Sequence, residues 1–227
     1  LFYLLNICDP GKNRNLRHLS FPVFPDIFEI LLSTYHGLTV FVIVFPEKVA
    51  LPLENINLSL PSRQVTVIFG PNGVGKSTLL KIISTLEPLT NGLILNRGQT
   101  VYKQLSKIRQ TIGLVMHEPL AYPNLTAREN LKFLGNLYRT KDLEQRVDNL
   151  LSEFGLSDQA DRLICHFSRG MMQKFMIAKA LLNDPHTLLL DEPFSGLDPV
   201  NANLIREEID NLRHNGTCLL YTSPSPR

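Results

Sequence analysis

Residues 64–84 read QVTVIFGPNGVGKSTLLKIIS, and this stretch decides the fold. Its first residues, Gln64–Phe69, are rich in β-branched side chains, which predicts a β-strand. From Leu79 onward the apolar residues recur at helical spacing, which predicts an α-helix. The glycines between them therefore lie on a strand-to-helix turn, the setting in which a glycine-rich loop can hold phosphate.

The loop has the spacing GxxxxGKS, and its glycines leave room for backbone N–H groups to surround a phosphate. Lys76 supplies a charge for the β- and γ-phosphates of a nucleotide, while Ser77 offers a hydroxyl to magnesium and Thr78 a second hydroxyl. A glycine-rich turn without function is the alternative. The predicted ATP-binding residues of this loop are Gly70, Pro71, Asn72, Gly73, Val74, Gly75, Lys76, Ser77 and Thr78.

A second motif, HTLLLDEP at 186–193, places two acids after a short apolar run. Leu188–Leu190 has the pattern of a parallel strand covered on both faces, and ligands bind at the carboxyl ends of such strands. Asp191 can hold magnesium, and Glu192 can orient and deprotonate an attacking water. Solvated turn carboxylates are the alternative reading of the pair.

The segment between these motifs has helical periodicity. Thr126 and Glu129 form a capping box, and apolar residues of 143–154 share one helical face before Gly155. We therefore expect a helical insertion over about 102–166. It is followed by FSRGM at 167–171, where Ser168 can cap a helix and Gly170 permits another group to approach the backbone closely. The alternative is that Ser168 is only a helix cap.

Composition excludes some classes of function. With 23 basic and 21 acidic residues the formal net charge is +2, which gives no electrostatic footprint for nucleic acid. The three cysteines, Cys8, Cys165 and Cys218, fit neither a disulfide framework nor a zinc site, so a reducing cytoplasmic compartment is expected. Residues 30–45 carry no charge but fall short of the ~20 residues that span a bilayer. A strand over 38–45 is the preferred interpretation, and a membrane span the alternative.

The chain resembles the ATP-binding cassette (ABC) ATPases over residues 39–217. GPNGVGKST at 70–78 looks like the Walker A loop, LLLDE at 188–192 like Walker B, FSRGM like the signature motif, and SGLD at 195–198 like the D-loop. The resemblance implies an α/β fold with a P-loop NTPase core, a largely parallel sheet, a small antiparallel β subdomain and the helical insertion. It also implies a dimer in which Ser168 and Gly170 of one subunit close over the ATP at Lys76 of the other, with Asp198 in the D-loop.

Two positions depart from the family pattern. His117 stands where the family usually has glutamine, and Arg169 stands where its signature usually has glycine. Neutral histidine can still bond a water or a ligand of magnesium, so His117 is a catalytic candidate beside Glu192; a loop residue without a role is the alternative. Together with SRGM and the segment 125–138, His117 is similar to the heme-exporter ATPases of cytochrome c maturation. Some drug and polysaccharide exporter ATPases are also similar.

Phe45 lies about where the family has an aromatic residue that stacks on adenine, and phenylalanine offers the necessary ring face. A buried phenylalanine at a strand end is the alternative. Residues 1–38 carry no interpretable pattern and are left as an unassigned extension.

The last ten residues, CLLYTSPSPR at 218–227, do not follow the family pattern of an apolar strand and then a histidine that contacts the γ-phosphate. CLLY could begin that strand, but the prolines of SPSP cannot continue it. The codons for these residues resemble a transposase adapter of sequencing libraries, so 218–227 is expected to be an adapter remnant. A genuine C-terminus is the alternative. ATP binding with poor hydrolysis is expected of the chain as it stands.

The function that follows is an ATPase subunit that couples ATP-driven dimer closure to export through a separate transmembrane permease, with heme as the candidate substrate. It would use ATP and magnesium, form a homo- or heterodimer, bind no nucleic acid, and lie in the cytoplasm on the inner face of the plasma membrane. The alternatives are a soluble ABC protein that acts on ribosomes or nucleic acid, and a degenerate ATP-binding regulatory cassette.

Overall fold

The computed structural model describes strands 4–6, 33–35 and 38–40, residues 53, 56, 58 and 60, and residues 64–96, 99–101 and 105–224. Phe45, the expected adenine contact, lies outside the described residues. The strands are β1 Leu4–Asn6, β2 Ser33–Tyr35, β3 Leu38–Val40, β4 Val65–Gly70, β5 Leu95–Asn96, β6 Gln99–Thr100, β7 Ile112–Val115, β8 Thr187–Leu190 and β9 Cys218–Pro224. The helices are α1 Lys76–Ile83, α2 Leu105–Arg109, α3 Ala127–Tyr138, α4 Leu143–Glu153, α5 Arg169–Ala180 and α6 Pro199–His214, with short 3-10 turns η2 Ser157–Gln159 and η3 Ile164–His166.

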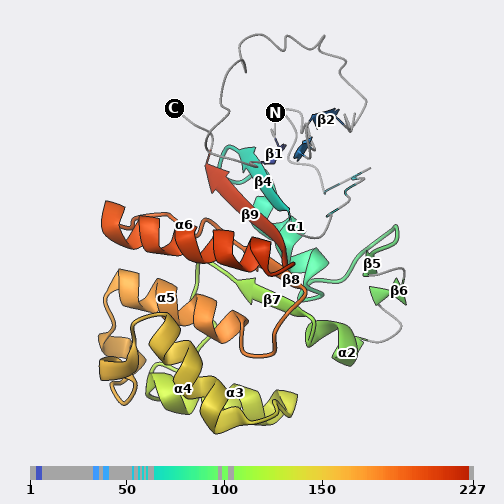
Figure 1. The fold of residues 1–227 in the computed structure, drawn as a ribbon. Coiled ribbons are helices and arrows are strands. Elements are labelled where there is room, and N and C mark those ends of the chain that lie inside the picture. Colours follow the sequence, from blue (N-terminus) through green and yellow to red (C-terminus); the bar gives the residue numbers. More distant parts are fainter. Residues whose placement is uncertain are drawn as a thin grey trace.

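The main sheet has the order β1-β4-β9-β8-β7, and its last four strands run parallel (Figure 1). β1 pairs antiparallel with β4 at the edge, and β2–β3 and β5–β6 form two small antiparallel pairs. This confirms the expected α/β fold with a largely parallel sheet. Residues 4–6 of the unassigned extension thus contribute an edge strand to the domain.

Side chains of the parallel strands alternate between two packed faces. Ile68, Leu189 and Leu220 pack with Leu79 and Leu80 of α1 on one face. Val67, Leu188, Leu190 and Leu219 pack on the other face, in the cluster that holds Phe175 of α5 and Ile205 of α6. Because both faces are covered by helices, consecutive residues of a strand can be apolar, as Leu188–Leu190 of β8 are.

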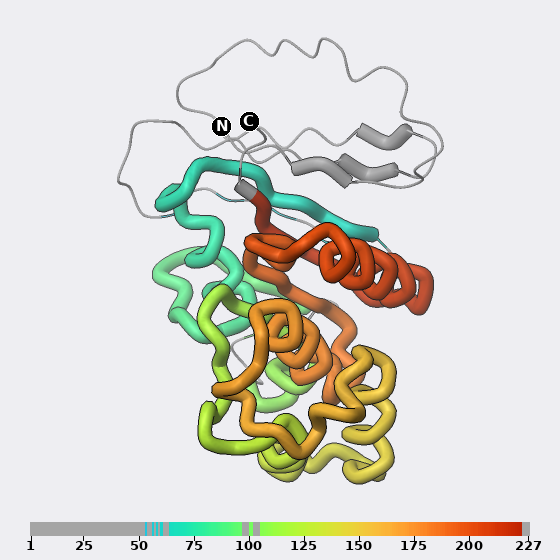
Figure 2. The backbone as a smooth tube through the Cα atoms, turned by 90° about the vertical axis from the view of Figure 1, so that its left-hand side faces the viewer, coloured from blue at the N-terminus to red at the C-terminus, as the bar shows by residue number. Residues whose placement is uncertain are grey.

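The helical part of the chain packs as a separate layer below the sheet in Figure 2, where 127–180 is coloured from yellow-green to orange. Its expected boundary at residue 102 is wrong, because β7 at 112–115 belongs to the central sheet and pairs with β8. The helical layer begins only with α3, whose capping box at Thr126 and Glu129 is present as predicted. IGLV at 112–115 is too short an apolar run for its period to distinguish a strand from a helix.

The tail contributes a central strand, so the expected domain boundary at residue 217 is also wrong for the fold. β9 lies between β4 and β8, and Leu219 and Leu220 are completely buried. The strand reaches Pro224, beyond the CLLY that was expected to begin it. Proline is tolerated there because β8 ends at Leu190, opposite Tyr221, so Pro224 lies past the part of the ladder that is bonded on both sides. The adapter origin of 218–227 stays a prediction.

One buried amide holds the loop that enters the helical layer. Asn130 of α3 is fully buried; it accepts from the N–H of Tyr122 at 2.8 Å and donates to the carbonyls of Tyr122 at 3.0 Å, Leu125 at 3.3 Å and Thr126 at 2.9 Å. The amide is the partner of the Tyr122 N–H, and it gives a second bond to three carbonyls that already accept from backbone N–H groups.

We predict that Asn130→Ala lowers the free energy of unfolding by about 3 kcal/mol, because it leaves the N–H of Tyr122 without its partner and removes three further bonds from a fully buried site. Urea denaturation monitored by circular dichroism measures this change. The control is Asn136→Ala, an exposed position of the same helix, for which a change of no more than about 0.5 kcal/mol is expected. Equal effects of the two substitutions would contradict the role assigned to the amide.

Candidate active site

The glycine-rich loop leads from β4 into α1 as predicted. Gly75 is the N-cap of α1 and has φ +103°, a conformation that favours glycine. Ser77 and Thr78, in the first turn of the helix, are exposed. The first N–H groups of a helix have no partner within it, so this turn presents donors and hydroxyls to one ligand.

Lys76 is the buried member of the loop, with 6% of its surface exposed. Its Nζ donates to the carbonyl of Gly70 at 2.7 Å and to that of Pro71 at 3.0 Å, so the side chain folds back along the loop. Burial lowers the pKa of Lys76, and the carboxylates of Glu192 and Asp191 offset part of this effect. The loop and the two acids therefore lie within electrostatic range of one another.

The acid pair follows β8, next to β9 in the sheet. Asp191 is buried, donates its N–H to the carbonyl of Val115 at 2.8 Å, and accepts from the hydroxyl of Thr222 at 2.7 Å. The N–H of Glu192 donates to the same hydroxyl at 2.9 Å. Glu192 has φ +48°, a left-handed conformation that is uncommon for glutamate and holds the side chain at the strand end.

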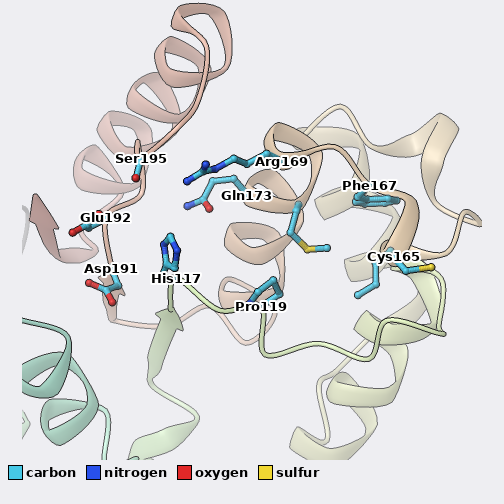
Figure 3. Close-up of a pocket in the computed structure, with 11 residues that line it drawn as sticks. His117, Pro119, Cys165, Phe167, Arg169, Gln173, Asp191, Glu192 and Ser195 are labelled. Atoms are coloured by element: carbon cyan, nitrogen blue, oxygen red, sulfur yellow. The ribbon is translucent and has the colours of Figure 1, made fainter.

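A cavity of about 400 Å³ opens beside the acid pair. Figure 3 shows His117, from the end of β7, between the acids and the start of α5, with Arg169 and Gln173 reaching in from that helix. His117 and Glu192, the two catalytic candidates, thus line one cavity. The cavity is lined by His117, Pro119, Ile164, Cys165, Phe167, Arg169, Met172, Gln173, Asp191, Glu192 and Ser195.

The other predicted residues lie at helix starts. Ser168 caps α5 by accepting from the N–H of Met171 at 3.2 Å, and Asp198 caps α6 by accepting from the N–H of Asn201 at 3.0 Å. The bonds from Asn201 lower the pKa of Asp198. Both capping residues are exposed, and neither lines the cavity.

The sequence did not single out several residues that the fold brings to the site. Thr222 bridges the two acids, and Gln173 and Ser195 line the cavity. The side-chain Nε2 of Gln173 is buried without a hydrogen-bond partner. The helical period of 169–180 could have placed Gln173 one turn after Arg169, but only the packing of α5 against β7 brings both to the cavity of the acids.

Two side chains of the site carry oxygen donors of the kind that magnesium prefers. Asp191 is a carboxylate, and the hydroxyl of Ser77 is exposed at the start of α1. Such oxygen donors suit Mg²⁺, which proteins commonly hold through one or two side chains and a phosphate. Within the part of the chain that the structure describes, no group of three or more His, Cys, Asp or Glu side chains could hold a metal ion by itself.

Comparison with known proteins agrees with this geometry. The family model described as ABC transporter matches residues 53–195, and the chain belongs to this family. It is 36% identical over 180 residues to the ABC transporter ATP-binding protein NatA of Bacillus subtilis, covering 78% of this chain and 73% of that protein. It is 36% identical to the lantibiotic transport ATP-binding protein SrtF of Streptococcus pyogenes, covering 75% and 72%. The chain is therefore an ATP-binding subunit of the ABC transporter class.

Solved structures show the same fold. The ATP-binding cassette MJ0796 in a dimeric post-hydrolysis state bound to ADP and Pi has a TM-score of 0.70 and 28% identity, over 79% of this chain and 83% of that one. An ATP-binding subunit of an ABC transporter has a TM-score of 0.68 and 31% identity, over 76% and 72%. These neighbours confirm the class of ABC ATPase.

The comparisons do not support the heme-exporter subtype expected from His117 and SRGM. The relatives include a linearmycin resistance ATP-binding protein of B. subtilis, 38% identical, of which the chain covers 56%, and a bacitracin transport ATP-binding protein of Enterococcus faecalis, 33% identical. Those names concern antibiotics.

One half-buried charge connects the loop after His117 to α5. Lys179 donates to the carbonyl of Leu120 at 2.6 Å, and burial lowers the pKa of Lys179 from the ordinary 10.5 to about 8. The folded chain therefore releases this proton near pH 8, whereas the unfolded chain keeps it to about pH 10.5. Between these values unfolding takes up a proton, so this group makes stability rise with pH, and its penalty is fully present below pH 8.

We predict that the free energy of unfolding of the wild type rises relative to that of Lys179→Met as the pH goes from 7.5 to 10, because methionine has no proton to release. Urea titrations at both pH values measure the difference. Lys174→Met, on the same helix, is the reference for the loss of a lysine. Parallel pH curves for the wild type and Lys179→Met would show that burial does not shift this group.

Proposed function

We propose that the chain binds ATP and magnesium at the loop 70–78 and hydrolyses ATP with Glu192 as general base. The observation that carries this proposal is the meeting of Lys76, Asp191 and Glu192, which come from the ends of two different strands. In this assignment Lys76 and the first turn of α1 hold the phosphates, and Ser77 with Asp191 supplies the oxygen ligands of magnesium. Bound magnesium would neutralise charge that develops on the phosphates.

Glu192 is suited to water activation by its position. Glu192 lines the cavity and follows a buried strand. Its left-handed backbone conformation fixes the direction in which the side chain leaves the main chain. His117 lines the same cavity from the end of β7, where its ring can hold the water or a ligand of magnesium in line. The proposed roles are therefore general base for Glu192 and orientation for His117.

The remaining motif residues support a dimer. Ser168 and Gly170 at the start of α5, and Asp198 at the start of α6, do not line the cavity that holds Glu192. Ser168 and Asp198 are exposed, and an exposed helix start presents free N–H groups to a phosphate. We assign these residues to the ATP of a second subunit, which the class of protein and the dimeric cassette structure support. Phe45 is retained as the proposed adenine contact.

The transport role rests on the family. ABC ATP-binding subunits dimerise and work with membrane permeases, and among the described residues no helix is both long and apolar enough to cross a bilayer. We propose a location on the inner face of the plasma membrane through a permease. The names of the antibiotic relatives favour export of an antimicrobial compound over export of heme. They also favour transport over action on ribosomes or nucleic acid.

We predict that Glu192→Gln retains ATP binding but lowers turnover by about 100-fold or more, because the amide cannot accept the proton of the attacking water. Nucleotide binding by calorimetry and phosphate release measure the two effects. Lys76→Ala is the matched control and is expected to lose ATP binding itself. Unchanged turnover in Glu192→Gln would remove the proposed base, and unchanged binding in Lys76→Ala would remove the proposed site.

A second prediction concerns residues 218–227. Replacing them with the corresponding segment of the B. subtilis relative NatA is expected to raise ATP turnover by about tenfold or more while ATP affinity stays within about twofold. The reason is that the resemblance implies a histidine after this strand that contacts the γ-phosphate, and CLLYTSPSPR contains no histidine. Phosphate release by the two chains at saturating ATP measures this, and equal turnover would mean that residues 218–227 already support hydrolysis.

A further inference from the structure

The side chain that departs from the family signature makes a specific contact. Arg169 is the first residue of α5, and its guanidinium lies directly against Gly196 of the D-loop. A Cβ atom built on Gly196 would lie 2.2 Å from Cζ and from Nη1 of Arg169 and 2.6 Å from Nη2. Only a residue without a side chain leaves this space for the guanidinium, and Gly196 also has φ +66°, which favours glycine.

A second close approach lies beside the first. A Cβ atom on Gly170 would lie 2.9 Å from Nδ2 and 3.0 Å from Cγ of Asn201 in the first turn of α6. The Asn201 side chain in turn donates to Asp198 at 2.5 Å. The start of α5 is therefore packed against the D-loop and the start of α6 at two neighbouring points within one subunit.

The segment between Glu192 and Asp198 is held from outside at Glu192, by the hydroxyl of Thr222, and at Phe194, by the ring of Tyr221 and the guanidinium of Arg206. Its backbone bonds are short-range: the N–H of Ser195 donates to the carbonyl of Glu192 at 3.0 Å, and that of Leu197 to the carbonyl of Phe194 at 3.4 Å. Gly196 is exposed, and Glu192 has a strained backbone conformation. A further contact at Gly196, made from α5, therefore influences the conformation of this segment.

Arg169 also faces the cavity of the acid pair. In Figure 3 its guanidinium extends from α5 toward Ser195 and Glu192, alongside Gln173. The side chain is exposed and, among the described residues, forms none of the salt bridges found in the structure. Its contact with Gly196 is thus a packing contact, made by the planar guanidinium in the cavity that Asp191 and Glu192 also line. Lysine has no planar group, so it would fit this contact less well.

We propose that Arg169 is a positioning residue that clamps the segment Glu192–Asp198 against the start of α5. In one subunit it would couple the proposed general base to Ser168 and Gly170, the residues assigned to the ATP of the second subunit. The glycine usual at position 169 in the family has no side chain to make this contact. The functional consequence rests on the proposed function above, whereas the clamp itself does not.

Hydrogen exchange of the nucleotide-free chain tests the clamp directly. In Arg169→Ala the amides of Ser195 and Leu197, which flank Gly196, are expected to exchange about tenfold faster, because Gly196 loses its contact with the guanidinium. The matched control is Arg162→Ala, an exposed arginine whose side chain bonds only Gln159, and it should leave both amides unchanged. The melting temperature should stay within about 2 °C in both variants, as expected of exposed side chains. Equal exchange in the two variants would overturn the proposal.

Gly196→Ala provides an independent test of the contact between Arg169 and Gly196. Its methyl group would occupy the space of the guanidinium, which must then move away because the arginine side chain is flexible. Adding Arg169→Ala to Gly196→Ala should therefore change the exchange of Leu197 by no more than about twofold, compared with about tenfold in the Gly196 background. If Arg169→Ala has the same effect in both backgrounds, the contact with Gly196 is not how Arg169 acts.

Kinetics then test the coupling. In the chain with its tail replaced, Arg169→Ala is expected to lower kcat by about tenfold and to leave ATP affinity within about twofold, with partial recovery in Arg169→Lys. A loss of ATP affinity equal to the loss of kcat would mean that Arg169 contacts nucleotide directly, and would overturn the positioning role. If the unsubstituted chain neither binds nor hydrolyses ATP, the proposed function fails. The exchange experiments then still show whether Arg169 holds the segment Glu192–Asp198.

Discussion

The site depends on one constraint: four adjacent strands of the main sheet run parallel, so their carboxyl ends meet at the same edge. The loop 70–78, His117 and the acid pair follow β4, β7 and β8 respectively. Each segment is far from the others along the chain. Because the backbone ladder fixes the register of Val115 opposite Leu190, His117 and Glu192 leave the sheet at the same level.

The starts of three helices lie around this edge of the sheet. α1 carries a buried lysine at its start, and α5 and α6 bring capped, exposed starts to the other side of the acids. Two glycine contacts, Gly196 with Arg169 and Gly170 with Asn201, bind these starts together. A charged side chain at 169 therefore gives this cassette a physical link between two motifs that the usual glycine would leave to backbone packing alone.

Buried polar groups locate the loops that carry function. Asn130 bonds backbone groups of the loop before α3. Lys179 donates to the carbonyl of Leu120, in surroundings that lower the pKa of this lysine. Thr222 serves both acids with one hydroxyl. Each of these groups is a single side chain that pairs main-chain or carboxylate atoms, so local order near the cavity rests on few interactions.

The sequence by itself determined the class of fold, the glycine-rich loop, the acid pair after a strand and the helix caps at Thr126 and Ser168, since each is set by local spacing and hydrogen-bonding chemistry. Tertiary structure alone decided that 112–115 and 218–224 are strands of the central sheet, because short apolar runs become strands only through their neighbours. It also decided that Arg169 meets Gly196 and that Thr222 meets Asp191. Those contacts join residues more than 25 positions apart, and no spacing pattern in one chain encodes them.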